Sequence, residues 1–276
     1  MSTPNETLPE FFAPPVIEVA LGVQFSPPIP FKAAHVGRLW AEYADQFPRT
    51  EDQPPVTSVV EVPEGQTAPL PSFRFVGTPP LPRCWFLNEA QTDLIQIQND
   101  KFIRNWRKVT GQEDYPRYEY IRETFVRDYA VLERFVASEQ LGELHPTQCE
   151  VTYVNHILPS EAWQRHGQLD RVLSLLRNDV RAEFLPEAED VRCTIRYVIK
   201  DDSGAFLGRL NADAQPALMT GDRTPLLVLT LTARGRPDGE GLDGVLKFLD
   251  RGRKWIVRGF VDLTTDQMQT IWERRS

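Results

Sequence analysis

The stretch VIEVALGVQF, residues 16–25, alternates large apolar side chains with polar or small ones along its whole length. The large apolar residues take every second position: Ile17, Val19, Leu21, Val23 and Phe25. A period of two residues is the signature of a strand that buries one of its faces. Prolines at positions 27, 28 and 30 then end the strand, because proline cannot donate to a sheet ladder. This strand is therefore predicted to begin a sheet with one buried face.

C-terminal to this strand, apolar spacing predicts a helix over residues 31–47, followed by a series of short strands. The strands are expected over residues 56–62, 72–76, 84–87, 93–98 and 102–108, and the last two form a hairpin over Asn99-Asp100. A long helix over residues 118–136 follows, with Ile121, Phe125, Tyr129, Leu132 and Phe135 facing the sheet.

A similar order then begins again. A strand is predicted over residues 148–158, a helix over 161–176, strands over 191–200, 205–210 and 226–233, a helix over 242–257 and a short helix over 265–272. Consecutive strands without helical crossovers favour antiparallel pairing. We therefore expect an α+β fold of two pseudo-repeated units of antiparallel, curved β-sheet, each backed by long helices on one face.

The domain boundaries follow from the same pattern. Residues 1–15, MSTPNETLPEFFAPP, are rich in proline and polar side chains and are predicted to be a flexible arm. Residues 16–140 form the first unit and residues 141–276 the second, and the two units could equally form one continuous domain.

Composition restricts the setting and the partners. The net charge of −8 argues against a broad surface for duplex nucleic acid. Three scattered cysteines favour a reducing cytoplasm over a disulfide framework. The chain shows neither a signal peptide nor an apolar run of about 20 residues, the length that a membrane span requires. A cytoplasmic protein without membrane contact is expected.

Three short segments carry a resemblance to a known family. They are Pro14-Pro15-Val16-Ile17-Glu18-Val19, the stretch from Leu94-Ile95-Gln96-Ile97-Gln98 to Asn105-Trp106-Arg107, and Tyr115-Pro116-Arg117-Tyr118. The chain resembles an uncharacterised family of sporadically distributed bacterial proteins. The resemblance implies a bacterial, cytosolic setting and brings no activity, cofactor or catalytic residue.

Known catalytic and cofactor motifs are not found in the sequence. It contains neither GxxxxGK[ST] nor GxGxxG, so no phosphate-binding loop is expected. The four histidines lack HExxH or a paired Cys/His spacing, and no G-x-S-x-G elbow occurs. The sequence therefore predicts no cofactor and no metal, and it favours a protein that is not an enzyme.

The most informative residues are polar side chains that strand alternation turns away from the apolar face. A curved sheet could present them as a platform for a protein or small-molecule partner, although a solvated sheet face carries the same residue types. Together with Arg117 of the loop that precedes the first long helix, the ligand-binding candidates are Gln96, Gln98, Arg104, Trp106, Arg107, Arg117, His156, Arg192 and Arg196.

The leading hypothesis is thus a non-enzymatic binding or partner protein, and two alternatives remain. An enzyme could use His156 as an acid or base beside Glu150 and Arg196. A single-stranded nucleic-acid-binding protein could use aromatic and basic residues that are close in sequence. These are Arg104, Trp106, Arg107, Lys108, Arg117 and the basic cluster of Arg251, Arg253, Lys254 and Arg258. No sequence feature sets the oligomeric state.

Overall fold

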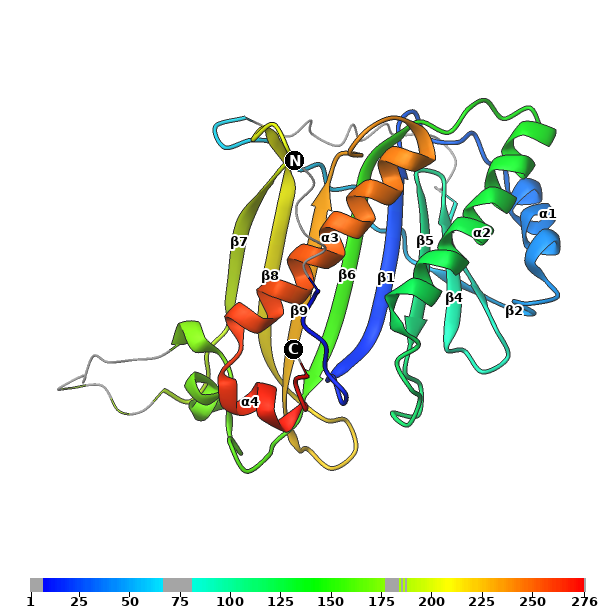
Figure 1. Cartoon of the computed structure of the whole chain (residues 1–276). Coiled ribbons are helices and arrows are strands. Elements are labelled where there is room, and N and C mark those ends of the chain that lie inside the picture. Colours follow the sequence, from blue (N-terminus) through cyan, green and yellow to red (C-terminus); the bar gives the residue numbers. More distant parts are fainter. Residues whose placement is uncertain (1–6, 67–80, 177–183, 185, 187, 276) are drawn as a thin grey trace.

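The computed structural model describes residues 7–66, 81–176, 184, 186 and 188–275. In this part of the chain, nine strands form one antiparallel sheet in the order β2-β3-β4-β5-β1-β6-β9-β8-β7 (Figure 1). The strands are β1 (Val16–Phe25), β2 (Arg49–Gln53), β3 (Arg83–Leu87), β4 (Asp93–Gln98), β5 (Lys101–Arg107), β6 (Pro146–Ile157), β7 (Cys193–Lys200), β8 (Phe206–Leu218) and β9 (Pro225–Gly235). The expectation of antiparallel sheet with helices is confirmed.

Strand β1 lies near the centre of the sheet, between β5 and β6. Val19, Leu21, Val23 and Phe25 are at most 2% exposed, as their alternation predicts. The register shifts between Val16 and Glu18, so that Val16 takes the buried position that the pattern assigned to Ile17. A bulge of this kind adds one residue to a strand and changes which side chain faces the core.

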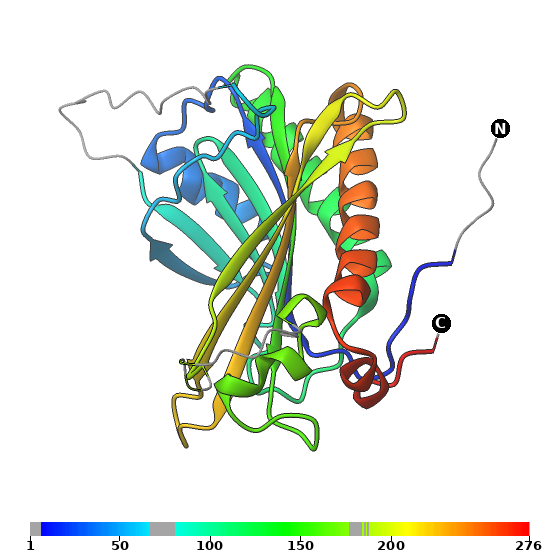
Figure 2. The same cartoon turned by 90° about the vertical axis from the view of Figure 1, so that its left-hand side faces the viewer.

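The helices are α1 (Ala33–Tyr43), α2 (Arg117–Ser138), α3 (Gly241–Leu263) and α4 (Asp266–Ile271). Helices α2 and α3 cover one face of the sheet, α2 over β5 and β1 and α3 over β6 and β9 (Figure 2). We call this side the helix face and the opposite side the open face. Helix α1 packs beside α2 over β3, with the Tyr43 ring 6.0 Å from that of Phe86.

Some predicted elements differ from the observed ones. Residues 161–176 form two short 3-10 turns, η1 (His166–Arg171) and η2 (Ser174–Leu176), instead of a helix. Their contacts explain the difference, since Thr265 donates its backbone N–H to Val172 O and the His166 ring contacts Leu226 O. The last long helix continues to Leu263, six residues beyond its predicted end at residue 257, and β8 continues to Leu218.

Residues 56–62 are not a strand. They belong to a segment, residues 54–66, that crosses the open face and that we call the strap. Its Val56 exchanges hydrogen bonds with Gln98, and its Glu61 receives one from Arg209. Strand β2 was not predicted, because its sequence RTEDQ lacks an apolar face. The strand predicted over residues 72–76 lies outside the described residues.

Candidate ligand-binding site

On the open face of the first half, polar side chains form a hydrogen-bonded row across four strands. Arg83 Nη1 and Trp85 Nε1 donate to Gln96 Oε1, at 2.7 and 3.1 Å. Gln96 donates to Asn105, which donates to Glu18. Burial raises the pKa of the Glu18 carboxyl. Because the Gln96 amide oxygen and nitrogen are both hydrogen-bonded within this row, Gln96 has a structural role here.

Two further candidates on this face are also held by the protein itself. The Arg107 guanidinium lies 5.4 Å from the centre of the Trp85 ring and donates to Gln91 O. Gln98 is bound to the strap through Val56. The strap therefore covers part of the platform that the sequence predicted.

Arg104 and Trp106 do not lie on the open face, which corrects the prediction. Arg104 pairs in register with Leu21 and Trp106 with Val19, so both point to the helix face. Trp106 is 4% exposed and packs against Tyr115, with ring centres 5.5 Å apart. A buried indole cannot stack on a nucleic-acid base.

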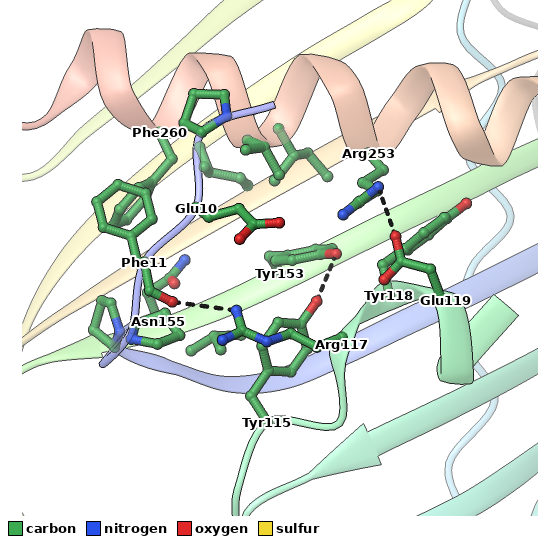
Figure 3. Close-up of a pocket in the computed structure, with 17 residues that line it drawn as sticks. Glu10, Phe11, Tyr115, Arg117, Tyr118, Glu119, Tyr153, Asn155, Arg253 and Phe260 are labelled. Atoms are coloured by element: carbon green, nitrogen blue, oxygen red, sulfur yellow. Dashed lines mark hydrogen bonds and ion pairs between the residues drawn. The ribbon is translucent and has the colours of Figure 1, made fainter. Parts of the chain in front are cut away.

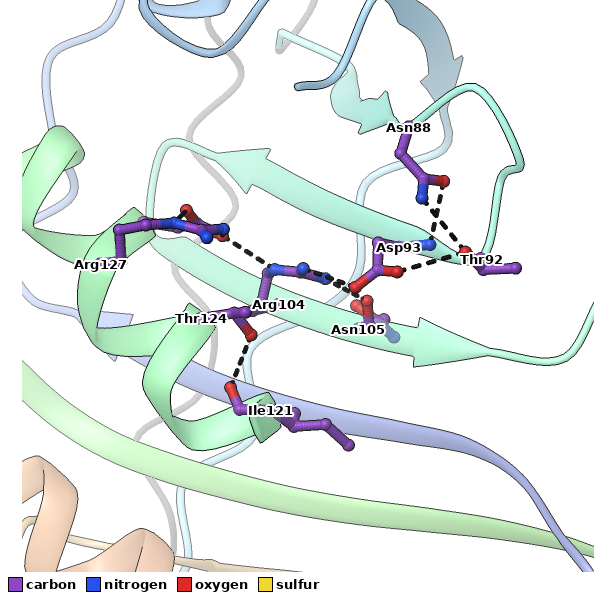
Figure 4. Close-up of polar contacts among 9 residues, drawn as sticks. Asn88, Thr92, Asp93, Arg104, Asn105, Ile121, Thr124 and Arg127 are labelled. Carbon is purple, nitrogen blue, oxygen red and sulfur yellow. Dashed lines mark hydrogen bonds and ion pairs between the residues drawn. The ribbon is translucent and has the colours of Figure 1, made fainter. Parts of the chain in front are cut away.

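Arg104 is instead the centre of a buried ion network (Figure 4). Its Nε donates to Asp128 Oδ2 at 2.9 Å and its Nη2 to Asp93 Oδ1 at 2.6 Å. Arg127 holds the other oxygen of Asp128, with an Nε–Oδ1 distance of 2.8 Å. A charged side chain is expected on the buried face of a strand only where buried partners neutralise it. The alternation within β5 gives no sign of such partners, so Arg104 was assigned to the open face.

The remaining candidates are far from one another. His156 and Glu150 face the same side of β6 but are six residues apart, about 20 Å at the rise of an extended strand. Arg196 lies on edge strand β7, which β8 and β9 separate from β6, and Arg192 precedes β7. Glu150 pairs with Arg234, whose Nε lies 2.6 Å from its Oε2. The expected group of His156, Glu150 and Arg196 is not assembled.

A cavity of about 260 Å³ lies instead on the helix face, beside residues 9–15 of the arm (Figure 3). Strand β6 provides its floor through Tyr153 and Asn155, and α3 provides one wall. The start of α2 and residues 9–16 close the other sides. Of the nine ligand-binding candidates only Arg117 lines this cavity, together with Arg253 of the basic cluster.

Residues 8–15, predicted to belong to a flexible arm, are held here by the C-terminal segment. Phe12 and Ala13 donate backbone N–H groups to Glu273 O and Trp272 O, at 3.1 and 3.2 Å. Phe11 is 7% exposed and packs edge-on against Phe260, with ring centres 5.5 Å apart. This part of the arm therefore forms a wall of the cavity.

The polar groups of the cavity include two guanidinium groups and a pair of phenols, beside Glu10, Glu119 and Asn155. The Tyr115 and Tyr153 hydroxyl oxygens lie 3.0 Å apart. Arg117 Nη1 donates to Phe11 O at 3.2 Å, and Arg253 Nη1 lies 3.1 Å from Glu119. Each guanidinium also stacks on a tyrosine, Arg117 on Tyr115 at 5.7 Å and Arg253 on Tyr118 at 4.8 Å.

Some of the hydrogen-bond donors that line this cavity are not used by the protein itself. Arg253 Nε is buried and has no hydrogen-bond partner among the described residues. Burial raises the pKa of both Tyr115 and Tyr153, so both phenols are neutral at pH 7. Only one hydroxyl hydrogen is used within the pair, and the other can be donated into the cavity.

Sequence reasoning missed most of this site because its residues come from five separate segments. Tyr153 and Asn155 occupy positions of β6 that face the helices, where alternation predicts apolar side chains. Polar groups at these two buried positions were the one sign in the sequence that a site could lie on this face. Arg253 was assigned to a basic cluster, but the cluster members diverge: Arg251 pairs with Asp238 and Asp202, whereas Arg253 faces the cavity.

No protein-family model, curated protein or solved structure matches this chain. Among the described residues, no helix is long and apolar enough to cross a membrane. No group of three or more His, Cys, Asp and Glu side chains in the described part of the chain is arranged to hold a metal ion.

Proposed function

We propose that this protein binds a small organic anion with an apolar body in the helix-face cavity and does not transform it chemically. The observation that carries the proposal is the buried, unpartnered Nε of Arg253 beside the Tyr115–Tyr153 pair. Both supply donors, and a buried donor without an acceptor costs about 1–3 kcal/mol. A carboxylate oxygen of a ligand would remove that cost.

The rest of the cavity favours a ligand with an apolar body. Leu231, Ile256, Val257 and Phe260 line it from β9 and α3. Two acids, Glu10 and Glu119, also line it, but Glu119 is 70% exposed and contacts Arg253 from the solvent side. The aromatic faces of Tyr115 and Tyr118 are already occupied by the protein's own guanidinium groups. A cationic ligand would therefore find these two aromatic faces taken.

Calorimetric titration with hexanoate and benzoate tests this function, with hexylamine and hexanol as probes that lack the anionic group. We expect the carboxylates to bind more tightly than the amine and the alcohol. Arg253→Met should weaken carboxylate binding roughly ten- to hundredfold, as loss of a hydrogen bond to a charged group does.

Arg251→Met is the matched control, since Arg251 lies on the same helix and contacts Asp238 and Asp202 instead of the cavity. Equal affinity of the four probes, or equal loss in the two variants, would contradict the proposal.

We further propose that the two halves are copies of one ancestral unit. In each half, the first strand pairs with the last strand of its meander, β1 with β5 and β6 with β9. The remaining strands extend outward, and a long helix follows the meander. An experimental structure in which β1, β3–β5 and α2 do not superpose on β6–β9 and α3 would refute this duplication. A cytoplasmic setting remains our proposal, supported by three unpaired cysteines.

A further inference from the structure

The helix-face cavity carries hydrogen-bond acceptors as well as donors. Glu10 lines it from the arm, and the Glu10 carboxylate points toward the middle of the cavity in Figure 3. None of the hydrogen bonds and ion pairs among the described residues uses this carboxylate. Asn155 on the floor donates its Nδ2 to Leu229 O at 3.0 Å, so the amide oxygen of Asn155 remains available as an acceptor. Donors and acceptors therefore face the same cavity.

The charges that line this cavity balance one another. In the described part of the chain they are the guanidinium groups of Arg117 and Arg253 and the carboxylates of Glu10 and Glu119. A ligand with a carboxylate alone would add a negative charge near Glu10, and like charges in a partly enclosed site repel. An ammonium group on the same ligand would offset this repulsion and give Glu10 a charged partner.

The size and the apolar wall of the cavity restrict the ligand further. Pockets for drug-sized ligands measure about 300–1,000 Å³, so a volume of about 260 Å³ favours a smaller molecule. Leu231, Ile256 and Phe260 provide an apolar wall. An α-amino acid carries its carboxylate, its ammonium group and its side chain on one carbon. It can therefore present all three groups within one small cavity.

We propose that the ligand of this cavity is a free α-amino acid with an apolar side chain. Its carboxylate contacts Arg253 and the Tyr115–Tyr153 pair, and its ammonium group contacts Glu10 and Asn155. The inference rests on the proposed function, because the carboxylate uses the same donors, and it adds an ammonium group that this function does not require. A residue within a peptide lacks one of the two charges, so the free amino acid is the form that fits.

Calorimetric titration of the full chain with L-leucine and L-phenylalanine tests the proposal. Isocaproate and hydrocinnamate are the matched probes, since they are the same two molecules without the amino group. Each amino acid should bind at least about tenfold more tightly than its matched probe, because only the amino acid forms a charge-assisted hydrogen bond to Glu10. Isoamylamine, which keeps the ammonium group of leucine but lacks the carboxylate, should also bind more weakly than leucine.

Glu10→Gln removes the charge but keeps the shape of an exposed side chain. It should weaken leucine binding by about tenfold and should not weaken isocaproate binding, because the variant also loses the repulsion between two carboxylates. Arg253→Met should weaken the binding of both. Glu273→Gln is the matched control, because Glu273 belongs to the segment that pairs with the arm and lies outside the cavity. It should leave both affinities unchanged.

Three results would overturn the amino-acid assignment and leave the proposed function intact. These are equal affinity for leucine and isocaproate, unchanged leucine affinity in Glu10→Gln, and equal loss of leucine and isocaproate binding in that variant. Absence of binding by every carboxylate, hexanoate and benzoate included, would overturn both the assignment and the proposed function.

Discussion

In each half of the sheet the first strand pairs with the last strand of a meander, but β2 extends only the first half, and the helix face is covered to different extents. In β3 of the first half, Phe86 on the helix face is 1% exposed. In β7 of the second half, Tyr197 on the same face is 40% exposed. The difference arises in the segment after the first strand of each half, which forms a helix in one case and short turns in the other. The same pattern of strand pairing is therefore compatible with an outer strand whose helix face is covered and with one whose helix face is exposed.

The largest effect on stability is expected when the buried cation of the first half, Arg104, is removed. Arg104→Leu should lower the free energy of unfolding by about 3–5 kcal/mol, because Asp93 would lose its guanidinium partner and the buried Asp128 would keep only the half-exposed Arg127. Urea unfolding measures the change. A loss below about 1 kcal/mol would show that the network is not the main anchor of this half.

A pair of truncations compares coverage directly. Leu39→Ala removes a fully buried side chain of α1 and should cost about 2–5 kcal/mol. Tyr197→Ala, on the uncovered strand, should cost less than about 1 kcal/mol. Both values come from shifts of the urea midpoint at an unchanged slope. Equal losses would mean that β7 is covered in solution.

The smallest expected effect concerns the seam between the halves, where His156 of β6 is half-buried. Burial lowers the pKa of His156 below its ordinary value of 6.5. The unfolded chain therefore binds the proton more readily, and stability should fall as pH drops below about 6.5. His156→Gln should reduce this loss between pH 7 and 5.5 by less than about 1 kcal/mol. An unchanged pH profile would contradict the assignment to His156.

The sequence predicted the elements whose burial depends on local periodicity. β1, the β4–β5 hairpin, α2 and α3 were found where the apolar spacing placed them. Long-range contacts decided the rest. Val172 and His166 contact α4 and β9 in place of forming a helix, and the strap is held by side chains from four different strands. Periodicity contains no information on such partners.

The candidate site was predicted less well than the fold, for a related reason. Arg104 and Trp106 were assigned to the wrong face of the sheet. In β5, polar residues occur at both odd and even positions, so alternation alone does not show which set of side chains is buried. Arg117 was named as a candidate. Tyr153 and Arg253, which line the same cavity, lie 36 and 136 residues further along the chain. Only the folded chain brings these three residues to one cavity.

The pairing of residues 10–13 with residues 272–275 also orders events during synthesis. A ribosome releases the early residues long before Trp272 and Glu273 exist, so the segment that includes Phe11 must wait without its final partners. Contacts between residues this far apart in sequence form slowly and late. The cavity therefore gains its last wall only after residues 272–275 have been synthesised, and a chain interrupted before them would lack the contacts that hold this wall.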